Sequence, residues 1–465
     1  MIFLSAARPR ALLTLTTGIG AIIMAAPAQA DELPTLQKAI GNPGDFSLSG
    51  ATRLRYEALG GQARAGFGES EDLVSLRTII TAEYRTGALK FGAELHDARV
   101  FGIEPGSVVT ANEVNTVELV QAHATLALPG LLGKGSKTAV QAGRMTLNIG
   151  SRRLIAADDY RNTTNGYTGI RADTKLADGT AATILYMLPQ IRLPEDAASI
   201  RRGKIQMDRE NFDTQLWGAF LSRPRLVGRT MGEVAYVGFA EKDAPGRPSR
   251  DRRLSNISAR LISDPMPGKW DFEAEAIHQF GTVSTGTAAT APRQRVAAWL
   301  LHGDIGYSFP GAWKARLSIE YDLAGGDGPG GANGRFDTLY GMRRADFVPS
   351  GIYSAIGRTN ISTPGVRIEV APGKRLDAYA SYHPLWLANR FDSFSTTGVR
   401  DATGRSGNFA GHSLDGRLRW WAIPKALRAE LNASYIAKGR FLKEAPNAPR
   451  TGDSRYISIA LTANY

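Results

Sequence analysis

Apolar and polar residues alternate along most of the chain with a period of two. In residues 314–323 the odd positions are apolar up to Leu323, and the even positions are polar or charged, from Lys314 to Asp322. Residues 46–56 and 427–435 show the same alternation. A period of two places alternate side chains on opposite faces of a β-strand. We therefore expect an all-β protein whose strands have one apolar and one polar face.

The length of these segments favours a membrane barrel over a soluble sandwich. Many alternating segments run for about ten residues or more, which is the length a tilted strand needs to cross a bilayer. Their polar faces carry Arg as well as Asp and Glu, as expected for side chains that line a water-filled lumen. We therefore predict a single-domain transmembrane antiparallel β-barrel.

The pattern predicts about 18 strands, an even number as is usual for bacterial outer-membrane barrels. The expected strands are 45–57, 73–85, 88–99, 115–128, 138–149, 165–176, 180–188, 212–223, 231–241, 252–263, 269–281, 293–309, 312–323, 364–371, 375–388, 409–423, 426–437 and 454–465. Connections after odd strands are long and those after even strands are short. This parity places the short turns and both ends of the barrel in the periplasm, and the long loops outside.

Residues 1–30 have the features of a secretory signal peptide. Arg8 and Arg10 form a short basic region, residues 11–25 are free of charge and largely apolar, and residues 28–30 read Ala-Gln-Ala. A small residue on each side of a cleavage site is typical of such peptides. We expect cleavage before Asp31, which assigns residues 31–465 to the barrel and predicts a bacterial outer-membrane location.

The charge and cysteine content narrow the possible partners. The net charge is +12, of which Arg8 and Arg10 supply two, so residues 31–465 carry +10. A basic excess favours anionic partners, and export argues against nucleic acid. The chain has no Cys, which excludes disulfides and Cys-ligated metal.

The polar strand faces carry candidate lumen residues of both signs. The basic candidates are Arg53, Arg55, Arg77, Lys90, Arg144, Arg260, Arg316, Arg367, Arg417 and Arg419. The acidic candidates are Glu83, Glu94, Asp271, Glu273, Glu320, Asp322, Glu369, Asp377, Asp415 and Glu430. Many of these would pair across strands, and the excess of Arg would favour anions in a pore.

Two strand–loop junctions resemble the alginate export family of outer-membrane barrels. The first runs from Gly143 to Arg171 and resembles that family's G-R-x-x-L-x-x-G-x-x-R core and its aromatic-basic step, here Tyr160 and Arg161. The second runs from Tyr321 to Asp327 and resembles a Y-D-x-A-S-G-D step, with Gly325 in place of Ser. An F-D-x-L-Y segment follows at residues 336–340.

The resemblance implies an 18-stranded barrel with an electropositive lumen that passes a polyuronate. It implies that Arg144, Arg152 and Arg171 contact uronate carboxylates, and that Arg161 also does so. Arg53, Arg55 and Arg77 are further lumen candidates. The chain departs from the family near its C-terminal end, where a long periplasmic loop is replaced by Pro424 and Lys425. That departure leaves both gating and a polymeric cargo open.

Three functions follow from these features. The first is outward passage of an anionic polysaccharide such as alginate, for which a periplasmic tetratricopeptide-repeat lipoprotein would be a partner. The second is an anion-selective porin that takes up small uronates or other organic acids. The third is a barrel enzyme. The sequence contains no usable Ser/His/Asp arrangement, so we expect no enzymatic activity. Outer-membrane lipids and lipopolysaccharide are expected partners in all three.

No cofactor is expected from the sequence. The six His show no zinc-binding spacing. The glycine-rich segment 325–331 lacks the Lys and Ser/Thr of a phosphate loop. Its Asp327 could help bind Ca²⁺ in the extracellular loops, but nothing in the sequence defines a ligand set.

Overall fold

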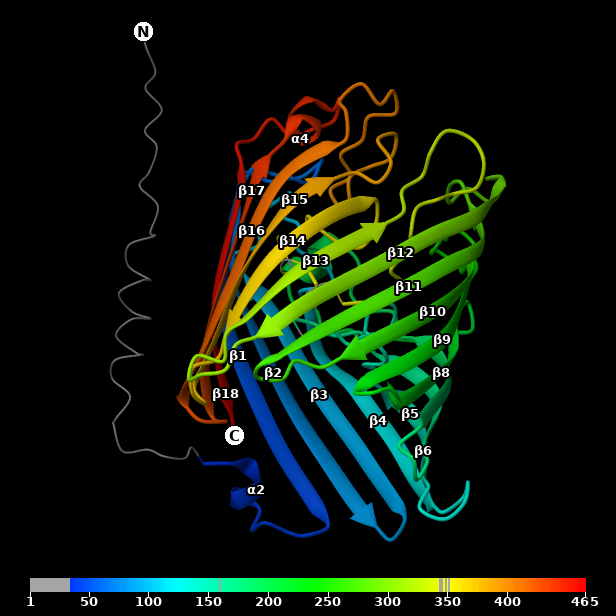
Figure 1. Ribbon diagram of the computed structural model, residues 1–465, viewed down its shortest axis with the longest axis vertical. Helices are drawn as coiled ribbons and strands as arrows, with labels where there is room; N and C mark the ends of the chain where they lie inside the picture. The colour runs from blue at the N-terminus through cyan, green and yellow to red at the C-terminus, as the bar shows by residue number, and fades with distance from the viewer. Residues whose placement is uncertain (1–33, 159, 343–345, 348, 350–351) are drawn as a thin grey trace.

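The protein is a closed barrel built from 18 antiparallel strands (Figure 1). The computed structural model describes residues 34–465 apart from 159, 343–345, 348 and 350–351. Each strand pairs with its neighbour in sequence, and β1 also pairs with β18, which closes the sheet. The predicted barrel and its strand number are therefore confirmed. The signal peptide expected at residues 1–30 lies outside the described residues and stays a prediction.

The strand boundaries follow the alternating segments of the sequence closely. The strands are β1 (Phe46–Gly60), β2 (Glu71–Thr86), β3 (Leu89–Phe101), β4 (Asn115–Pro129), β5 (Lys137–Met145), β6 (Tyr167–Lys175), β7 (Ala181–Pro189), β8 (Thr214–Val227), β9 (Thr230–Glu241), β10 (Arg253–Ser263), β11 (Lys269–Ser284), β12 (Arg293–Ser308), β13 (Arg316–Ala324), β14 (Ile361–Val370), β15 (Leu376–Trp386), β16 (Phe409–Ile423), β17 (Leu427–Lys438) and β18 (Ser454–Asn464).

The largest boundary errors have structural causes. Residues 146–149 were expected to continue β5, but the strand ends at Met145 because the chain turns into the lumen, where Leu147 is fully buried. Strand β13 begins at Arg316 rather than 312, after Lys314 adopts a left-handed conformation with φ 47°. Such a conformation breaks strand geometry in a residue that has a side chain.

The two faces of the wall are inverted relative to a soluble sheet. Along β13 the apolar Ile319 is 62% exposed and Tyr321 43% exposed, whereas Glu320 is 6% exposed and Asp322 3%. Exposed apolar and buried polar residues alternate in this way because the outer face meets lipid and the inner face meets the lumen. The apolar positions of the alternating sequence therefore form the outer, membrane-facing surface of the barrel, and the polar positions face the lumen.

The loops are long at one end of the barrel and short at the other. The longest described connection joins Ala324 to Ile361, whereas Thr86 is followed almost at once by Leu89. Helix α4 (Arg440–Glu444) lies at the long-loop end, opposite helix α2 (Leu36–Ala39) and the C terminus (Figure 1). Helix α3 (Ala197–Arg201) lies in the connection after β7. None of the helices in the described part of the chain has the length and apolar composition needed to cross a bilayer.

The seam between β1 and β18 is completed by the last residue. The main-chain groups of Tyr465 and Gly50 exchange two hydrogen bonds, and the Tyr465 hydroxyl lies 2.9 Å from Thr52 Oγ1. A Cβ at position 50 would overlap the Tyr465 ring. Gly50 therefore provides the space in which the terminal aromatic ring lies against the wall.

The hydrophobic core lies inside the barrel, where the long loops fold inward. Leu147, Phe336 and Phe394 of the loops and Phe441 of α4 belong to one buried cluster together with the wall residue Ile277. The loops thus contribute the apolar side chains that fill the interior near the long-loop end. This core fixes the loops that shape the channel.

Candidate functional site

The connection after β5 enters the lumen and docks on arginines of strands β1 and β2. We call residues 146–166 the first inner loop. Arg53 and Arg77 are paired across β1 and β2, and both donate to the main-chain carbonyl of Arg161, at 2.7 and 3.1 Å. Arg55 donates to the carbonyl of Tyr160 at 2.6 Å and lies over the Tyr160 ring. These arginines therefore hold the loop against the wall.

The same loop is also fixed by its own side chains. Arg161 forms an ion pair with Asp158 at 2.7 Å and donates to Asn112 at 3.0 Å. The Asn162 amide donates to three main-chain carbonyls, those of Leu76, Arg99 and Glu113. These three contacts tie the loop to β2, to β3 and to the connection that follows β3.

The connection after β13 forms a second inner loop, residues 325–360, which is anchored by Asp346. Arg153 of the first inner loop donates to Asp346 from Nε and from Nη2, both at 2.9 Å. Arg358 also donates to Asp346. Burial alone would raise the pKa of Asp346, but the guanidinium groups of Arg153 and Arg358 outweigh it and hold that pKa well below its usual range.

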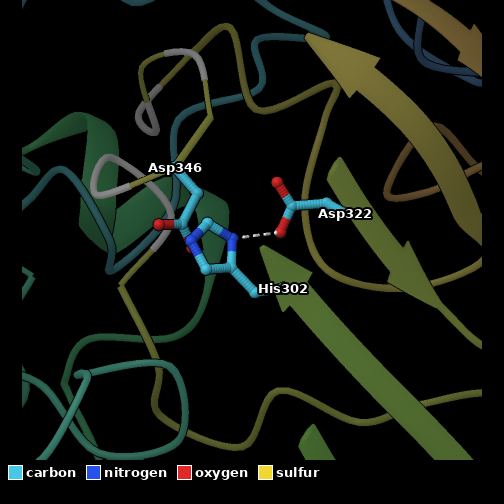
Figure 2. Close-up of side chains that lie close together, drawn as sticks. All are labelled: His302, Asp322 and Asp346. Atoms are coloured by element: carbon cyan, nitrogen blue, oxygen red, sulfur yellow. Dashed lines mark hydrogen bonds and ion pairs between the residues drawn. The ribbon is translucent and has the colours of Figure 1, made fainter. Parts of the chain in front are cut away.

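His302 and Asp322 extend this anchor into the wall, and Figure 2 shows the three side chains together. His302 Nδ1 lies 2.9 Å from Asp322 Oδ1, and Asp346 lies on the other side of the imidazole ring. A His and two Asp could in principle hold a metal ion. Here the two guanidinium groups bound to Asp346 already supply positive charge, so the cluster is better explained as a structural anchor.

The two inner loops are joined to each other by main-chain hydrogen bonds. Tyr340 N donates to Leu154 O at 3.1 Å, and Ala156 N donates to Tyr340 O at 3.1 Å. The Tyr340 ring packs edge-on against Tyr167, with centroids 5.6 Å apart. We call the two joined loops the neck of the barrel.

Toward the long-loop end, which loop parity assigns to the extracellular side, a hollow of about 630 Å³ lies above the neck between the connections after β7 and β9. Its basic lining residues are Arg192, Lys242, Arg247, Arg250 and Arg252. Its acidic lining residues are Glu195, Asp213 and Glu241. A smaller hollow of about 220 Å³ adjoins it and shares Arg250 and Arg252. We call the two together the extracellular vestibule.

Two arginines of the vestibule bind neutral oxygens rather than carboxylates. Arg192 donates to the side-chain oxygens of Asn165 and Asn112, at 2.6 and 2.5 Å. Its Nε is buried with no hydrogen-bond partner among the described residues. Arg250 donates to the Ser284 carbonyl at 2.9 Å and has no ion pair in the described part of the chain. Burial and the nearby guanidinium of Arg161 lower the pKa of Arg192.

Below the neck, a third hollow of about 520 Å³ lies near the periplasmic turns of β4 to β7. Small residues such as Ala139 and Ala181 line it, together with Lys137 and Lys175. The described interior therefore offers small hollows with basic groups on both sides of the neck.

The predicted site residues are divided among several places. Arg53, Arg55, Arg77 and Arg161 meet at the docked first inner loop. Arg171 lies in β6 and pairs with Asp173 of the same strand at 2.7 Å. These contacts show where the residues lie; their role toward uronates stays a prediction.

Arg144 is already held by two carboxylates, and its role toward uronates stays a prediction. In the ladder it lies opposite Ala122 and Thr168, out of phase with the buried Met145. Its guanidinium pairs with Glu118 at 2.7 Å and Glu210 at 2.9 Å. Because successive strand residues point to opposite sides of the wall, the neighbours Arg144 and Met145 start from opposite faces.

Arg152 is exposed, whereas its neighbour Arg153 is buried at the centre of the anchor. Arg153 pairs with Glu273 and Glu275, both at 2.6 Å, in addition to Asp346. The G-R-x-x-L-x-x-G-x-x-R spacing counted from Gly143 ends on Arg153. That spacing is the signal in the sequence that identifies Arg153 rather than Arg152.

Most other predicted lumen charges pair with one another. Arg260 lies 3.0 Å from Glu273, Arg367 lies 2.7 Å from Glu369, and Arg417 lies 2.9 Å from Asp377. Arg192 and Arg250, by contrast, were missed by the sequence because they lie in loops without periodicity. Neither shows a local signal that distinguishes it from a surface arginine.

A closed 18-stranded barrel with an apolar outer face and a charged interior defines an outer-membrane channel. The sequence model of the family described as alginate export matches residues 46–455. The chain belongs to that family, as its motifs indicated, and is located in the bacterial outer membrane. Comparison with curated proteins finds no match.

Solved structures share the fold at low sequence identity. OccK8 (OprE) of Pseudomonas aeruginosa is 12% identical, with a TM-score of 0.57 over 90% of this chain and 98% of that one. OccAB1 of Acinetobacter baumannii is 13% identical, with a TM-score of 0.58 over 93% and 99%. OccK2 (OpdF) of Pseudomonas aeruginosa, solved in complex with glucuronate, is 12% identical, with a TM-score of 0.54 over 90% and 96%.

Proposed function

We propose that this channel passes small organic anions that carry a carboxylate, with uronates as the leading class. The observation that carries the proposal is the extracellular vestibule, in which Arg192 and Arg250 donate to neutral oxygens. A guanidinium without a carboxylate partner can bind an entering carboxylate in bidentate fashion. Rings of such groups favour anions in pores.

The size of the interior supports a small cargo. The described hollows, of about 630, 220 and 520 Å³, have the scale of sites for single small molecules. The inner loops between them are tied together by the Arg153–Asp346 ion pair and by main-chain hydrogen bonds. A neck tied together in this way suits a small solute better than a long chain of sugars.

The structural neighbours are consistent with this size. OccK2 was solved with glucuronate and OpdK of Pseudomonas aeruginosa with vanillate, both of which are small carboxylates. The neighbours share only the fold with this chain, so they support the chemical class and leave the particular compound to experiment.

Export of a polyuronate is the second candidate. It rests on membership of the alginate export family, whose model covers residues 46–455. The short connection between Ile423 and Leu427 weighs against a long periplasmic plug of the kind expected for that role. We further propose that the channel has no enzymatic function.

Planar-bilayer recordings with salt gradients would test the proposal. We expect a reversal potential that indicates anion preference, and reduced chloride current in the presence of glucuronate. Arg192→Gln and Arg250→Gln should each weaken both effects several-fold, by removing a charge-assisted contact. The matched control is Arg440→Gln, because Arg440 lies on α4 and pairs there with Glu444.

Two outcomes would overturn the small-anion proposal. One is a channel without anion preference. The other is a channel that ignores glucuronate but is blocked by oligouronates of many residues, which would support polymer passage instead. Equal effects of Arg440→Gln and Arg250→Gln would show that general surface charge, rather than the vestibule, sets the preference.

A further inference from the structure

The outer face of the barrel has an apolar groove near its periplasmic end. The groove encloses about 720 Å³ and crosses strands β8 to β12. Its lining includes the exposed side chains of Leu221, Val234, Leu261 and Leu301, which mark it as part of the membrane-facing surface. It is therefore separate from the lumen and from the vestibule.

Small residues on adjacent strands form the floor of this groove. The ladder places Arg223 beside Gly232, Gly232 beside Leu261, and Leu261 beside Ala274. In the neighbouring row on the same face, Ala259 lies beside Ala276. The alanines leave the wall thin here, whereas the Leu226 side chain covers Gly232 and other large side chains border the groove.

Arginine lies at the periplasmic edge of the groove. Arg223 of β8 is itself part of the lining and is exposed, Arg225 follows near the end of the same strand, and Arg229 lies in the β8–β9 turn. A bulge between Arg223 and Val227 interrupts the pairing of β8 with β9. Trp270, 65% exposed, lies close by, because its carbonyl accepts a hydrogen bond from Arg229.

The charges around this edge are mostly basic. Lys269 at the start of β11 is exposed, as are Asp178 in the β6–β7 turn and Asp264 in the β10–β11 turn. Among the described residues at these strand ends and turns, the basic groups Arg223, Arg225, Arg229 and Lys269 outnumber the two acids. The edge therefore attracts an anion that sits at the membrane surface.

We propose that the groove binds one anionic phospholipid of the periplasmic leaflet. An acyl chain lies over Ala259 and Ala274, against the Leu226 side chain that covers Gly232, and the phosphate meets Arg223 and Arg225. Burying an acyl chain on a thin apolar floor is favourable, as is a charge-assisted contact to phosphate. The groove lies at the periplasmic end, which selects a phospholipid over lipopolysaccharide as the source of phosphate.

Native mass spectrometry of the purified barrel would test this proposal. Protein in detergent is mixed with phosphatidylglycerol or phosphatidylethanolamine of the same chain length. We expect one retained lipid and preference for phosphatidylglycerol. Ala274→Leu should reduce retention of either lipid about tenfold, because the added side chain fills the floor. Arg223→Gln with Arg225→Gln should remove the preference for phosphatidylglycerol.

Matched variants separate the groove from the rest of the membrane-facing surface. Ala433→Leu adds the same volume at an exposed alanine of β17, and Lys374→Gln removes an exposed cation from the β14–β15 turn. Neither should change retention. Loss of lipid from Ala433→Leu equal to that from Ala274→Leu would overturn the proposal.

Other results would also overturn it. These are no lipid retained by the unmodified barrel, equal retention of the two lipids, and a barrel that is dimeric until Ala274→Leu makes it monomeric. The last result would assign the groove to a second copy of this chain. Folding of each variant is checked by the heat-dependent mobility shift of the barrel in gels.

Discussion

Arg153 and Asp346 come from two different long loops and form a buried ion pair in the lumen, with Arg153 Nε 2.9 Å from Asp346 Oδ2. Arg153 also binds two carboxylates of β11, Glu273 and Glu275. One guanidinium thereby joins the first inner loop, the second inner loop and the wall. The dimensions of the neck depend on this junction because each loop is held through the other.

Replacing Arg153 should therefore open the neck. Arg153→Met removes the positive charge that Asp346, Glu273 and Glu275 share. We expect the loss to destabilise the loop packing by about 3–5 kcal/mol. Single-channel recordings should show higher and noisier conductance. Arg171→Met is the matched control, because Arg171 pairs within its own strand and its side chain is 24% exposed. Unchanged conductance in Arg153→Met would show that the neck is held by other contacts.

The neighbouring arginines should differ in their effect on selectivity. Arg152 is exposed on the first inner loop, so Arg152→Glu should reduce anion preference several-fold by reversing a charge beside the pathway. Arg144→Gln should leave selectivity nearly unchanged, because Arg144 is bound by Glu118 and Glu210. Reversal potentials in a salt gradient measure both. The reverse order of effects would contradict the placement of these residues.

Docking of the connection after β7 should weaken as pH rises. Burial and the nearby Glu118 carboxylate raise the pKa of Asp208 to about 7, whereas an unfolded aspartate titrates near ~3.9. The docked loop thus keeps a proton that the released loop loses. This stabilisation is complete below pH ~4 and is lost as pH rises through the folded value.

Hydrogen exchange of residues 190–213 between pH 5 and 8, corrected for the intrinsic rate, measures this docking. Exchange should increase more than the intrinsic rate predicts in the unmodified chain. Asp208→Asn should flatten the profile, and Asp264→Asn, at an exposed turn, should leave it unchanged. A profile that persists in Asp208→Asn would assign the effect to another group.

Closure of the barrel should depend on the space at Gly50. Gly50→Val places a side chain where the Tyr465 ring lies, and overpacking of this kind costs about 1–3 kcal/mol. We expect less folded barrel in the outer membrane and a lower unfolding midpoint in urea. Gly416→Val on β16 is a suitable control, because a Cβ there meets only one main-chain oxygen, at 3.5 Å. Equal assembly of both variants would contradict the role of this contact.

The sequence by itself determined the wall of this protein. Period-two alternation arises because each side chain of a strand faces either the lipid or the lumen. This requirement acts at every strand position, so it can be read from the local sequence. For this reason the strand number, the loop parity and the outer-membrane location followed from the sequence, as did the family through its motifs around Gly143 and Tyr321. Each of these features could be predicted from residues that are close together in the sequence.

Only the tertiary structure decided which side chains and loops fill the lumen inside this wall. Arg53, Arg77 and Arg161 were predicted as lumen residues, but only the fold shows that the first two bind the Arg161 carbonyl. Arg192 and Arg250 lie in aperiodic loops, and their acceptors come from segments far away in sequence. Partnership across the lumen depends on how loops pack against one another, and no local pattern of side chains encodes that packing.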